Sequence, residues 1–288
     1  MGIADDILGP DGWHAALAAL AWQAEMGVAD ATCDAPASAY DLPVELARPA
    51  RAAQNPAAQS AAAAQTPVPQ TPAPQVPRPA PRPEAAQEVA LVEARALAAG
   101  ANSLEALREA MAGYEHCELK RGARNLVFGD GNPRARVMIL GEAPGADEDR
   151  EGRPFVGRAG QLLDRMLAAI GLSRGAPDAE KAVYITNVMV WRPPGNRDPS
   201  VEEIAMMLPF VQRHIALVDP DVLVLMGNTP CSAVLGQRGI LRLRGKWTQG
   251  LGRAVLPMTH PAYLLRNPIA KREAWADLLE IRMKLEGT

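Results

Sequence analysis

The 288-residue sequence predicts an α/β fold: a three-layer α/β/α domain with a central four-stranded parallel sheet, preceded by a disordered Pro/Ala-rich linker and a short N-terminal helix. Short apolar runs alternate with segments of helical spacing in the second half of the chain, as in a parallel sheet covered on both faces. Ten of the 26 prolines lie between Pro49 and Pro83, where large apolar residues are almost absent. We therefore expect a helical segment over 1–33, a linker over 34–84 and a folded domain over 85–288.

The first expected element is a helix at Trp13–Met26, with Asp11 as its N-cap. A helix of this length is marginally stable in water, so it should dock either on its own domain or on a partner protein. The linker that follows cannot bury enough apolar surface to offset the entropy lost on ordering. It serves either as a spacer, which we favour, or as a binding motif for a partner that recognises proline.

The folded domain is expected to begin with a helical stretch and then to alternate strands and helices. Strands are expected at 136–140, 183–190, 221–226 and 254–258. Helices are expected at 85–112 with an interruption at Gly100, and at 160–170, 200–218, 229–235 and 271–285. Ser200 and Glu203 form the capping-box pattern at the start of one of these helices. Ligands of such folds bind at the carboxyl ends of the strands, so polar residues that follow strands are the candidates for chemistry.

Composition and charge exclude several classes of protein. Residues 1–113 carry 6 basic and 13 acidic side chains, whereas residues 114–288 carry 24 and 20, so the folded domain is mildly basic and compatible with a polyanionic partner. No apolar run approaches the roughly 18 residues that cross a bilayer, which excludes a membrane span. The acidic N-terminus does not resemble a secretory signal, and three scattered cysteines do not make a disulfide framework. We expect a cytoplasmic protein.

The loop after the first expected strand is the first candidate site. Gly141 opens a tight turn in which backbone amides can approach a ligand, and Glu142 is the first polar side chain after the strand. A carboxylate there can activate a water molecule or stabilise a developing cation. The acidic run Asp147–Glu151 is expected to be a solvated surface. The loop lacks the Gly-Lys-Ser/Thr of a phosphate-binding loop.

Two further residues have the chemistry needed to bind a flat base. Phe155 lies in a loop between proline and glycine, where its ring could stack on a nucleobase, although core packing is the alternative. Asn187 lies inside the expected buried strand 183–190, and its amide matches one edge of a pyrimidine. The alternative for Asn187 is an amide satisfied by neighbouring backbone.

The remaining candidates point to DNA. Arg192 and Arg197 lie in the stiff loop Trp191–Pro199 and suit contact with a phosphate backbone. His260 follows the fourth strand beside a proline. The stretch Leu264-Leu265-Arg266 then offers an apolar wedge beside a cation, the means by which proteins hold a flipped nucleotide out of a duplex.

Three segments, GEAPGADEDREGRPFVGRAGQLLDRML, TNVMVWRPPGNRDP and HPAYLLRNP, occur in this order, and together they resemble the uracil-DNA glycosylase superfamily, most closely its family 4. The resemblance runs from about residue 114 to residue 285. It implies an enzyme that removes uracil from DNA with water as the nucleophile and leaves an abasic site.

The resemblance also implies roles for single residues. Glu142 matches the acidic residue of the first motif, and His260 matches the histidine that stabilises charge at uracil O2. Phe155 matches the ring that stacks on uracil and Asn187 the amide that reads the pyrimidine edge, with Gly141 beside them. The stretch Tyr263, Leu264, Leu265 and Arg266 matches the loop that intercalates into DNA.

The sequence departs from family 4 at its iron–sulfur cluster, which four cysteines hold in that family. Only Cys117 stands in place, while Tyr114, Trp191 and Met207 occupy the other three positions. One thiolate cannot hold such a cluster, and Cys231 is expected to be a small core residue. We predict that the cluster is lost, that no metal is bound, and that the three large side chains fill its volume.

The leading hypothesis is therefore a monomeric uracil-DNA glycosylase that acts on uracil-containing DNA. A branch of the superfamily that traps DNA covalently carries an inserted basic loop; this sequence has no such insertion, so we expect turnover. Two alternatives stay open: a catalytically altered DNA-binding or scaffold protein on the same fold, and a glycosylase for another deaminated base.

Overall fold

The computed structural model describes residues 84–287. The helix expected at Trp13–Met26 and the linker lie outside the described residues, apart from Glu84, which begins the first described helix. Between residues 84 and 287, no helix combines the length and the apolar character needed to cross a membrane. The helices are α3 (Glu84–Gly100), α4 (Leu104–Gly113), α5 (Leu119–Gly122), α6 (Ala146–Glu151), α7 (Arg158–Ala169), α8 (Val201–Val218), α9 (Asn228–Leu235), α10 (Ile240–Leu243), α11 (Pro261–Arg266) and α12 (Lys271–Glu286), with short 3-10 turns at η3 (Ala179–Lys181), η4 (Pro194–Asn196) and η5 (Pro268–Ala270).

The sheet has six strands in the order β1-β3-β2-β4-β6-β5. Its four central strands are parallel and are the four predicted from the sequence: β2 (Val137–Gly141), β3 (Val183–Asn187), β4 (Val222–Met226) and β6 (Arg253–Met258). The prediction missed two antiparallel edge strands, β1 (Asp130–Gly131) and β5 (Thr248–Gly250). Neither has a buried residue, so the apolar pattern that identifies a strand is absent from both.

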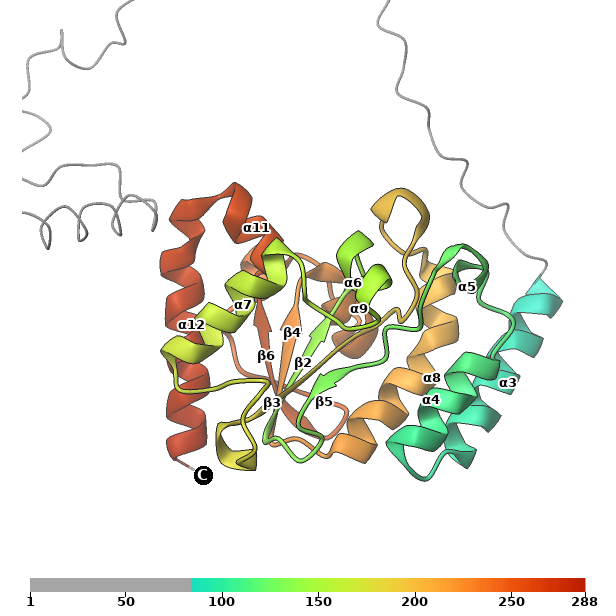
Figure 1. Cartoon of the computed structure of the whole chain (residues 1–288), viewed down its shortest axis with the longest axis horizontal. Coiled ribbons are helices and arrows are strands. Elements are labelled where there is room, and N and C mark those ends of the chain that lie inside the picture. The colour runs from blue at the N-terminus through green and yellow to red at the C-terminus, as the bar shows by residue number, and fades with distance from the viewer. Residues whose placement is uncertain (1–83, 288) are drawn as a thin grey trace, which may run out of the picture. The chain divides into compact units, whose positions relative to one another are not determined.

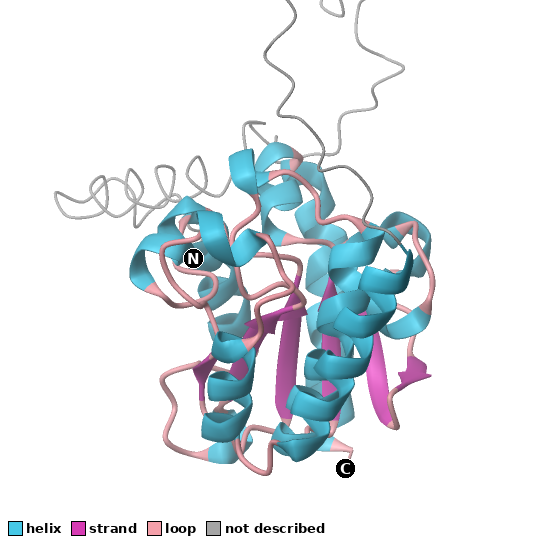
Figure 2. Cartoon of the chain, turned by 90° about the vertical axis from the view of Figure 1, so that its right-hand side faces the viewer, coloured by secondary structure: helices cyan, strands magenta, loops and turns pink. Residues whose placement is uncertain are grey.

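Helices cover both faces of the sheet (Figure 2). On one face, α7, α11 and α12 share an apolar core with the sheet, built around Leu163, Leu264 and Leu278. On the other face, α8 and α9 pack on the sheet, and α3 and α4 pack against α8 in a second core. The three-layer α/β/α prediction is confirmed. In Figure 1 the arrowheads of β2, β4 and β6 point toward α6 and α11, so these helices lie at the carboxyl edge of the sheet.

The pairing of β2 with β3 determines how the first two loops lie. The parallel register places Gly141 opposite Asn187. The predicted strand 183–190 ends at Asn187, yet its backbone continues the ladder: Val188 N–H donates to Gly141 O at 2.9 Å and Met189 N–H to Glu142 O at 3.0 Å. The two chains therefore stay in register for two residues beyond the strands.

The helix α8 begins as the sequence predicts. Ser200 Oγ accepts a hydrogen bond from Glu203 N–H at 3.2 Å, and Glu203 Oε2 accepts one from Ser200 N–H at 2.7 Å. This reciprocal pair satisfies two amides that the first turn would otherwise leave unpaired. The remaining acceptor capacity of Glu203 binds Arg197, at 2.6 and 2.9 Å. The helix start and the loop before it are thus fixed by one buried carboxylate.

Candidate active site

A cavity of about 980 Å³ opens at the carboxyl edge of the sheet. The predicted site residues that line it are Glu142, Phe155, Asn187, Arg197, His260, Tyr263 and Arg266. They come from the segments that follow β2, β3 and β6, which the fold brings together from positions more than a hundred residues apart. Arg192, Leu264 and Leu265 do not line the cavity.

Gly141, which has no side chain, lies directly behind two residues that line the cavity, Phe155 and Asn187. A Cβ atom at Gly141 would collide with Oδ1 of Asn187 and would lie 2.6 Å from two ring atoms of Phe155. Asn187 is only 3% exposed. Gly141 is therefore required because Asn187 and Phe155 approach each other across the end of β2, where any larger residue would push them apart.

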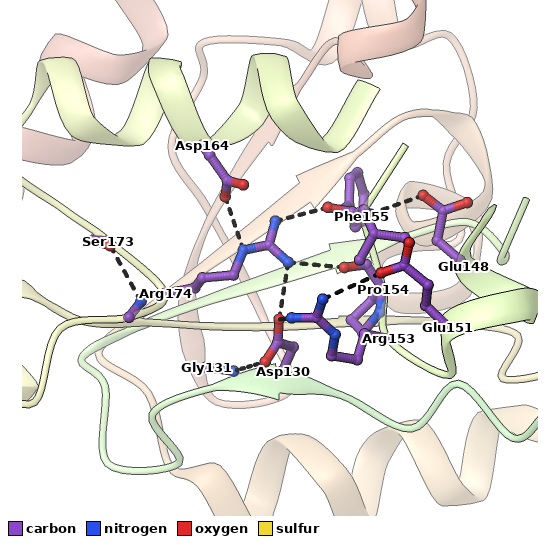
Figure 3. A network of polar contacts seen from close by, with 12 residues as sticks. Asp130, Gly131, Glu148, Glu151, Arg153, Pro154, Phe155, Asp164, Ser173 and Arg174 are labelled. Carbon is purple, nitrogen blue, oxygen red and sulfur yellow. Dashed lines mark hydrogen bonds and ion pairs between the residues drawn. The ribbon is translucent and has the colours of Figure 1, made fainter. Parts of the chain in front are cut away.

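The backbone of Phe155 is held in an unusual conformation. Its φ of 54° lies in the left-handed region, which costs free energy for a residue with a side chain. Arg174 stabilises this turn, because its guanidinium donates to the carbonyls of Pro154 and Phe155, both at 2.9 Å. Asp130 and Asp164 hold that guanidinium in turn, at 3.1 and 2.8 Å (Figure 3). Arg174 was not identified from the sequence, because an isolated arginine in a loop carries no motif.

The acidic run Asp147–Glu151 was predicted to be solvated, and for two of its members this is wrong. Glu148 Oε1 accepts hydrogen bonds from Val156 N–H and Gly157 N–H, each at 3.0 Å. Asp149 is 7% exposed and accepts from the backbone amides of two residues before β1, Arg124 and Asn125. These carboxylates lie on α6 and satisfy amides of the loops around the cavity, which composition alone could not indicate.

The carboxylate of Glu142 faces the cavity. Its Oε2 accepts a 2.7 Å hydrogen bond from Thr229 Oγ1, at the start of α9. Burial raises the pKa of Glu142, an effect that the Thr229 hydrogen bond opposes; Asp198 raises this pKa further and Arg238 lowers it. The result is a carboxylate more basic than one in water and so better suited to accept a proton from a water molecule. Thr229 is a site residue that the sequence did not reveal.

The imidazole of His260 is oriented by its own helix. His260 is the N-cap of α11, and its Nδ1 accepts a hydrogen bond from Ala262 N–H at 3.2 Å. Burial lowers the pKa of His260 to about 4, the charge of Arg266 lowers it as well, and Glu148 opposes them. The ring is therefore neutral at pH 7, and its proton lies on Nε2 because Nδ1 is an acceptor. Its centroid is 5.4 Å from that of the Phe155 ring.

The structure corrects part of the predicted DNA-binding set. Tyr263, Leu264, Leu265 and Arg266 form helix α11 rather than a loop. Leu264 is 1% exposed in the core, so the wedge prediction is wrong for this residue; Leu265 is partly buried and packs against the same core. The exposed apolar side chain of this region is Ile269 in η5, at 93%.

The two arginines of the Trp191–Pro199 loop differ in their contacts. Arg192 is half-buried, and its Nε donates to Asn196 Oδ1 at 2.8 Å within the same loop. Arg197 is bound to Glu203, as described above, and also donates to Asp198 O at 3.0 Å. Arg197 thereby orders the loop, and its guanidinium already has a carboxylate partner.

The residues at the family's cluster positions do not fit an iron–sulfur cluster. Tyr114, Cys117, Trp191 and Met207 are all buried in one apolar core. The Tyr114 hydroxyl donates to Ala90 O at 2.8 Å, and its ring meets that of Phe210 edge-on at 5.3 Å. Across residues 84–287, no three His, Cys, Asp or Glu side chains group to hold a metal ion. A cluster needs several thiolates, and the side chains at these positions instead complete a hydrogen-bonded apolar core.

The other described cysteine is also part of the core. Cys231 on α9 is fully buried, and burial raises the pKa of its thiol to about 12. A thiol with such a pKa stays protonated and is a poor metal ligand. The position of Cys231 agrees with the expectation of a small core residue.

Comparison with known proteins identifies the family. The family described as the Uracil DNA glycosylase superfamily matches residues 128–279. A type-4 uracil-DNA glycosylase of Sulfurisphaera tokodaii is 38% identical over 191 residues, which are 63% of this chain and 84% of that protein. Those of Thermotoga maritima and Pyrobaculum aerophilum are 42% identical over 154 residues (52% and 77%) and 39% identical over 184 residues (61% and 91%). The resemblance drawn from the three motifs is confirmed: the chain belongs to the uracil DNA glycosylase superfamily.

Proposed function

We infer that this protein is a DNA repair hydrolase that removes uracil from DNA by cleaving its N-glycosidic bond and leaves an abasic site. The observation that carries this inference is one cavity that holds a base-sized ring, a buried amide, a carboxylate and a neutral imidazole around Gly141. The names of the type-4 relatives support the same reaction.

Phe155 and Asn187 recognise the extruded base. The ring of Phe155 offers a face on which uracil can stack. Arg174 holds the backbone of Phe155 in place before uracil binds, so little conformational entropy is lost on binding. The amide of Asn187 offers one donor and one acceptor to the edge of uracil. Because Asn187 is buried, a base that mismatched its donor and acceptor would leave polar groups unpaired, which is unfavourable.

Bond cleavage separates charge between the sugar and the base. The electron pair of the C1′–N1 bond leaves with uracil, whose O2 becomes an acceptor for Nε2–H of neutral His260. Because the neutral imidazole of His260 is a weak acid, it stabilises the uracil anion by donating a hydrogen bond to it. The carboxylate of Glu142 stabilises the sugar cation and orients a water molecule, whose oxygen bonds to C1′ while its proton passes to Glu142.

We propose that the residues around the cavity mouth bind DNA. Arg266 and Tyr263 line the cavity. Arg192, unlike Arg197 of the same loop, has no carboxylate partner among residues 84–287, so its charge can meet a phosphate. Ile269 takes the place of the buried Leu264 as the apolar residue that enters the base stack, because Pro268 stiffens its turn and its side chain is exposed. Arg197 acts by ordering its loop.

The test is excision from a labelled oligonucleotide that carries one uracil, followed by alkaline cleavage. The wild-type chain should produce a cut strand, and Asn187→Ala should lose about 1–3 kcal/mol of base recognition, which lowers the rate roughly 5- to 150-fold. Asn102→Ala, at a site remote from the cavity lining, is the control. No cut strand from the wild type would favour a DNA-binding scaffold, and a cut only in a matched oligonucleotide that carries hypoxanthine in place of uracil would favour another deaminated base.

We also propose that the enzyme works without an iron–sulfur cluster or other metal. The buried Tyr114, Trp191 and Met207 support this proposal, since they supply packing and no thiolate. Aerobically purified protein should contain no iron or sulfide above background and should excise uracil at the same rate after dialysis against a chelator. Stoichiometric iron with matching sulfide would refute the proposal.

We propose that the catalytic domain folds and acts independently of residues 1–83. We propose a monomeric cytoplasmic enzyme whose catalytic domain is joined by a linker to a short helical segment that can engage a partner protein. Removing residues 1–83 should leave the melting temperature and the excision rate on naked DNA nearly unchanged, with the mass of one chain in solution. A collapse in melting temperature would instead mean that the removed segment stabilises the domain.

A further inference from the structure

The connection from α9 to α10 forms a second wall of the cavity. We call residues 238–242 the α10 arm; all five of them line the cavity that holds Glu142. The arm is anchored on one face of the sheet, because Ile240 packs against the core formed with α8. Tyr263 and Leu265 of α11 pack against the core on the other face. The cavity mouth is thus bounded from both faces of the sheet.

The arm presents two cations and one apolar side chain. Arg238, Leu241 and Arg242 are exposed, with Leu241 at 59%. Neither arginine forms an ion pair with a carboxylate among residues 84–287. By contrast, Arg244 two residues later is bound to Asp277, and Arg197 to Glu203. Exposed cations without partners beside a site for a polyanion favour contact with phosphate.

The arm is held in place before any ligand arrives. Asn228 begins α9, one residue beyond the end of β4 at Met226, and its Oδ1 accepts hydrogen bonds from Gly239 N–H and Ile240 N–H, each at 2.9 Å. Gly239 has a φ of 104°, which a side chain rarely permits, and the guanidinium of Arg242 lies over it. Because the arm is fixed to the sheet edge, little ordering entropy is lost when it binds.

We propose that the α10 arm is a second DNA-binding element that grips the strand on the side of the cavity opposite α11. Arg238 and Arg242 bind backbone phosphates next to the extruded nucleotide, and Leu241 packs against the base or sugar that the extrusion exposes. Arg238 lines the same cavity as Glu142, which places this contact on the side of the reacting sugar. The proposal rests on the proposed action on uracil in DNA.

The test for the arginines is the salt dependence of binding. The full chain binds a duplex with a tetrahydrofuran abasic analogue, which cannot be cleaved, over a range of salt concentrations. Each of Arg238→Gln and Arg242→Gln should lower the slope of log K against log salt by about 0.9, the value for one phosphate contact. Arg108→Gln on α4 makes the same charge change away from the cavity and should leave the slope as in the wild type. Slopes unchanged in both arm variants overturn the proposal.

The test for Leu241 compares two substrates. Leu241→Ala should slow single-turnover excision from duplex DNA several-fold more than excision from a single strand, because only the duplex has a stack to hold open. Its melting temperature should equal that of the wild type, since the side chain is exposed. Equal effects on both substrates overturn the role of Leu241. If the arm variants lower the salt slope as expected but the wild type never releases uracil, the proposed function is wrong while the role of the α10 arm in DNA binding is supported.

Discussion

The hydroxyl of Thr229 donates a 2.7 Å hydrogen bond to Oε2 of Glu142, and it thereby joins the start of α9 to the first residue after β2. Burial raises the pKa of Glu142, and this hydrogen bond opposes the rise by stabilising the charged form. Thr229 therefore fixes both the direction of the carboxylate and its readiness to accept a proton.

Replacing Thr229 by valine keeps the shape and removes the hydroxyl. The pKa of Glu142 should rise, so the carboxylate should be protonated at a higher pH than in the wild type. The acidic limb of single-turnover excision against pH should move to higher pH, and the plateau should fall because the carboxylate is less well oriented. Thr248→Val on the exposed strand β5 is the control. An acidic limb that stays in place would show that Thr229 does not tune Glu142.

Glu142 and His260 should act mainly in the transition state. Glu142→Gln and His260→Ala should each lower the single-turnover rate on the order of a hundredfold, while affinity for DNA changes little. The double variant should lose much less than the product of the two effects, because both groups stabilise one separated ion pair. Rates at the wild-type level combined with weakened binding would assign both residues to DNA contact.

Stability should depend on pH through the buried His214. Its Nε2 hydrogen-bonds with the hydroxyl of Tyr184 at 2.9 Å, and burial lowers its pKa to about 3. The unfolded chain binds the proton near pH 6.5 and the folded chain does not, so stability is full above that pH and falls as pH falls toward 3. The loss from this group is about 1.4 kcal/mol per pH unit within the window.

Urea unfolding at pH 7 and pH 5 measures this loss. His214→Gln, which retains a partner for Tyr184, should be less stable than the wild type at pH 7 and should lose less stability on going to pH 5. His116→Gln, at a half-buried histidine that pairs with Glu93, is the control. If the two variants and the wild type lose the same amount, the buried His214 is not the cause.

Alanine substitutions at Leu264 and Ile269 should distinguish a role in core packing from a role in DNA contact. Leu264→Ala should lower the free energy of unfolding by about 2–5 kcal/mol, the usual loss at a closed core site. Ile269→Ala should change it by less than about 0.5 kcal/mol, because the side chain is exposed. Only Ile269→Ala should slow duplex excision without lowering the melting temperature. If instead Leu264→Ala slowed duplex excision without lowering the melting temperature, and Ile269→Ala had no effect, the predicted leucine wedge would be supported.

The sequence was sufficient for features that depend on local pattern. The four parallel strands are mostly apolar and mostly buried, and α8 begins with Ser200 and Glu203 at capping-box spacing. The site residues after those strands meet because parallel strands end at one edge. The edge strands β1 and β5 carry no such pattern and depend on their neighbours for pairing.

The missed features depend on contacts between distant segments. Arg174 and Thr229 reach the site from elements that carry no motif of their own, so only the fold reveals them. The leucines after His260 have the composition of a wedge, but the α11 helix turns Leu264 into the core. Whether an apolar residue is buried or exposed here follows from helix phase, which six residues are too few to indicate.

The ladder between β2 and β3 continues past the last strand residues, where Met189 N–H holds the carbonyl of Glu142. Asn187, which we propose meets the base, and Glu142, which we propose meets the sugar, therefore lie on two adjacent segments joined by backbone hydrogen bonds. A shift of either chain would displace both side chains together. Under the proposed roles, base recognition and bond cleavage depend on the same stretch of backbone, so we expect a change of substrate to come from side chains on the surrounding loops.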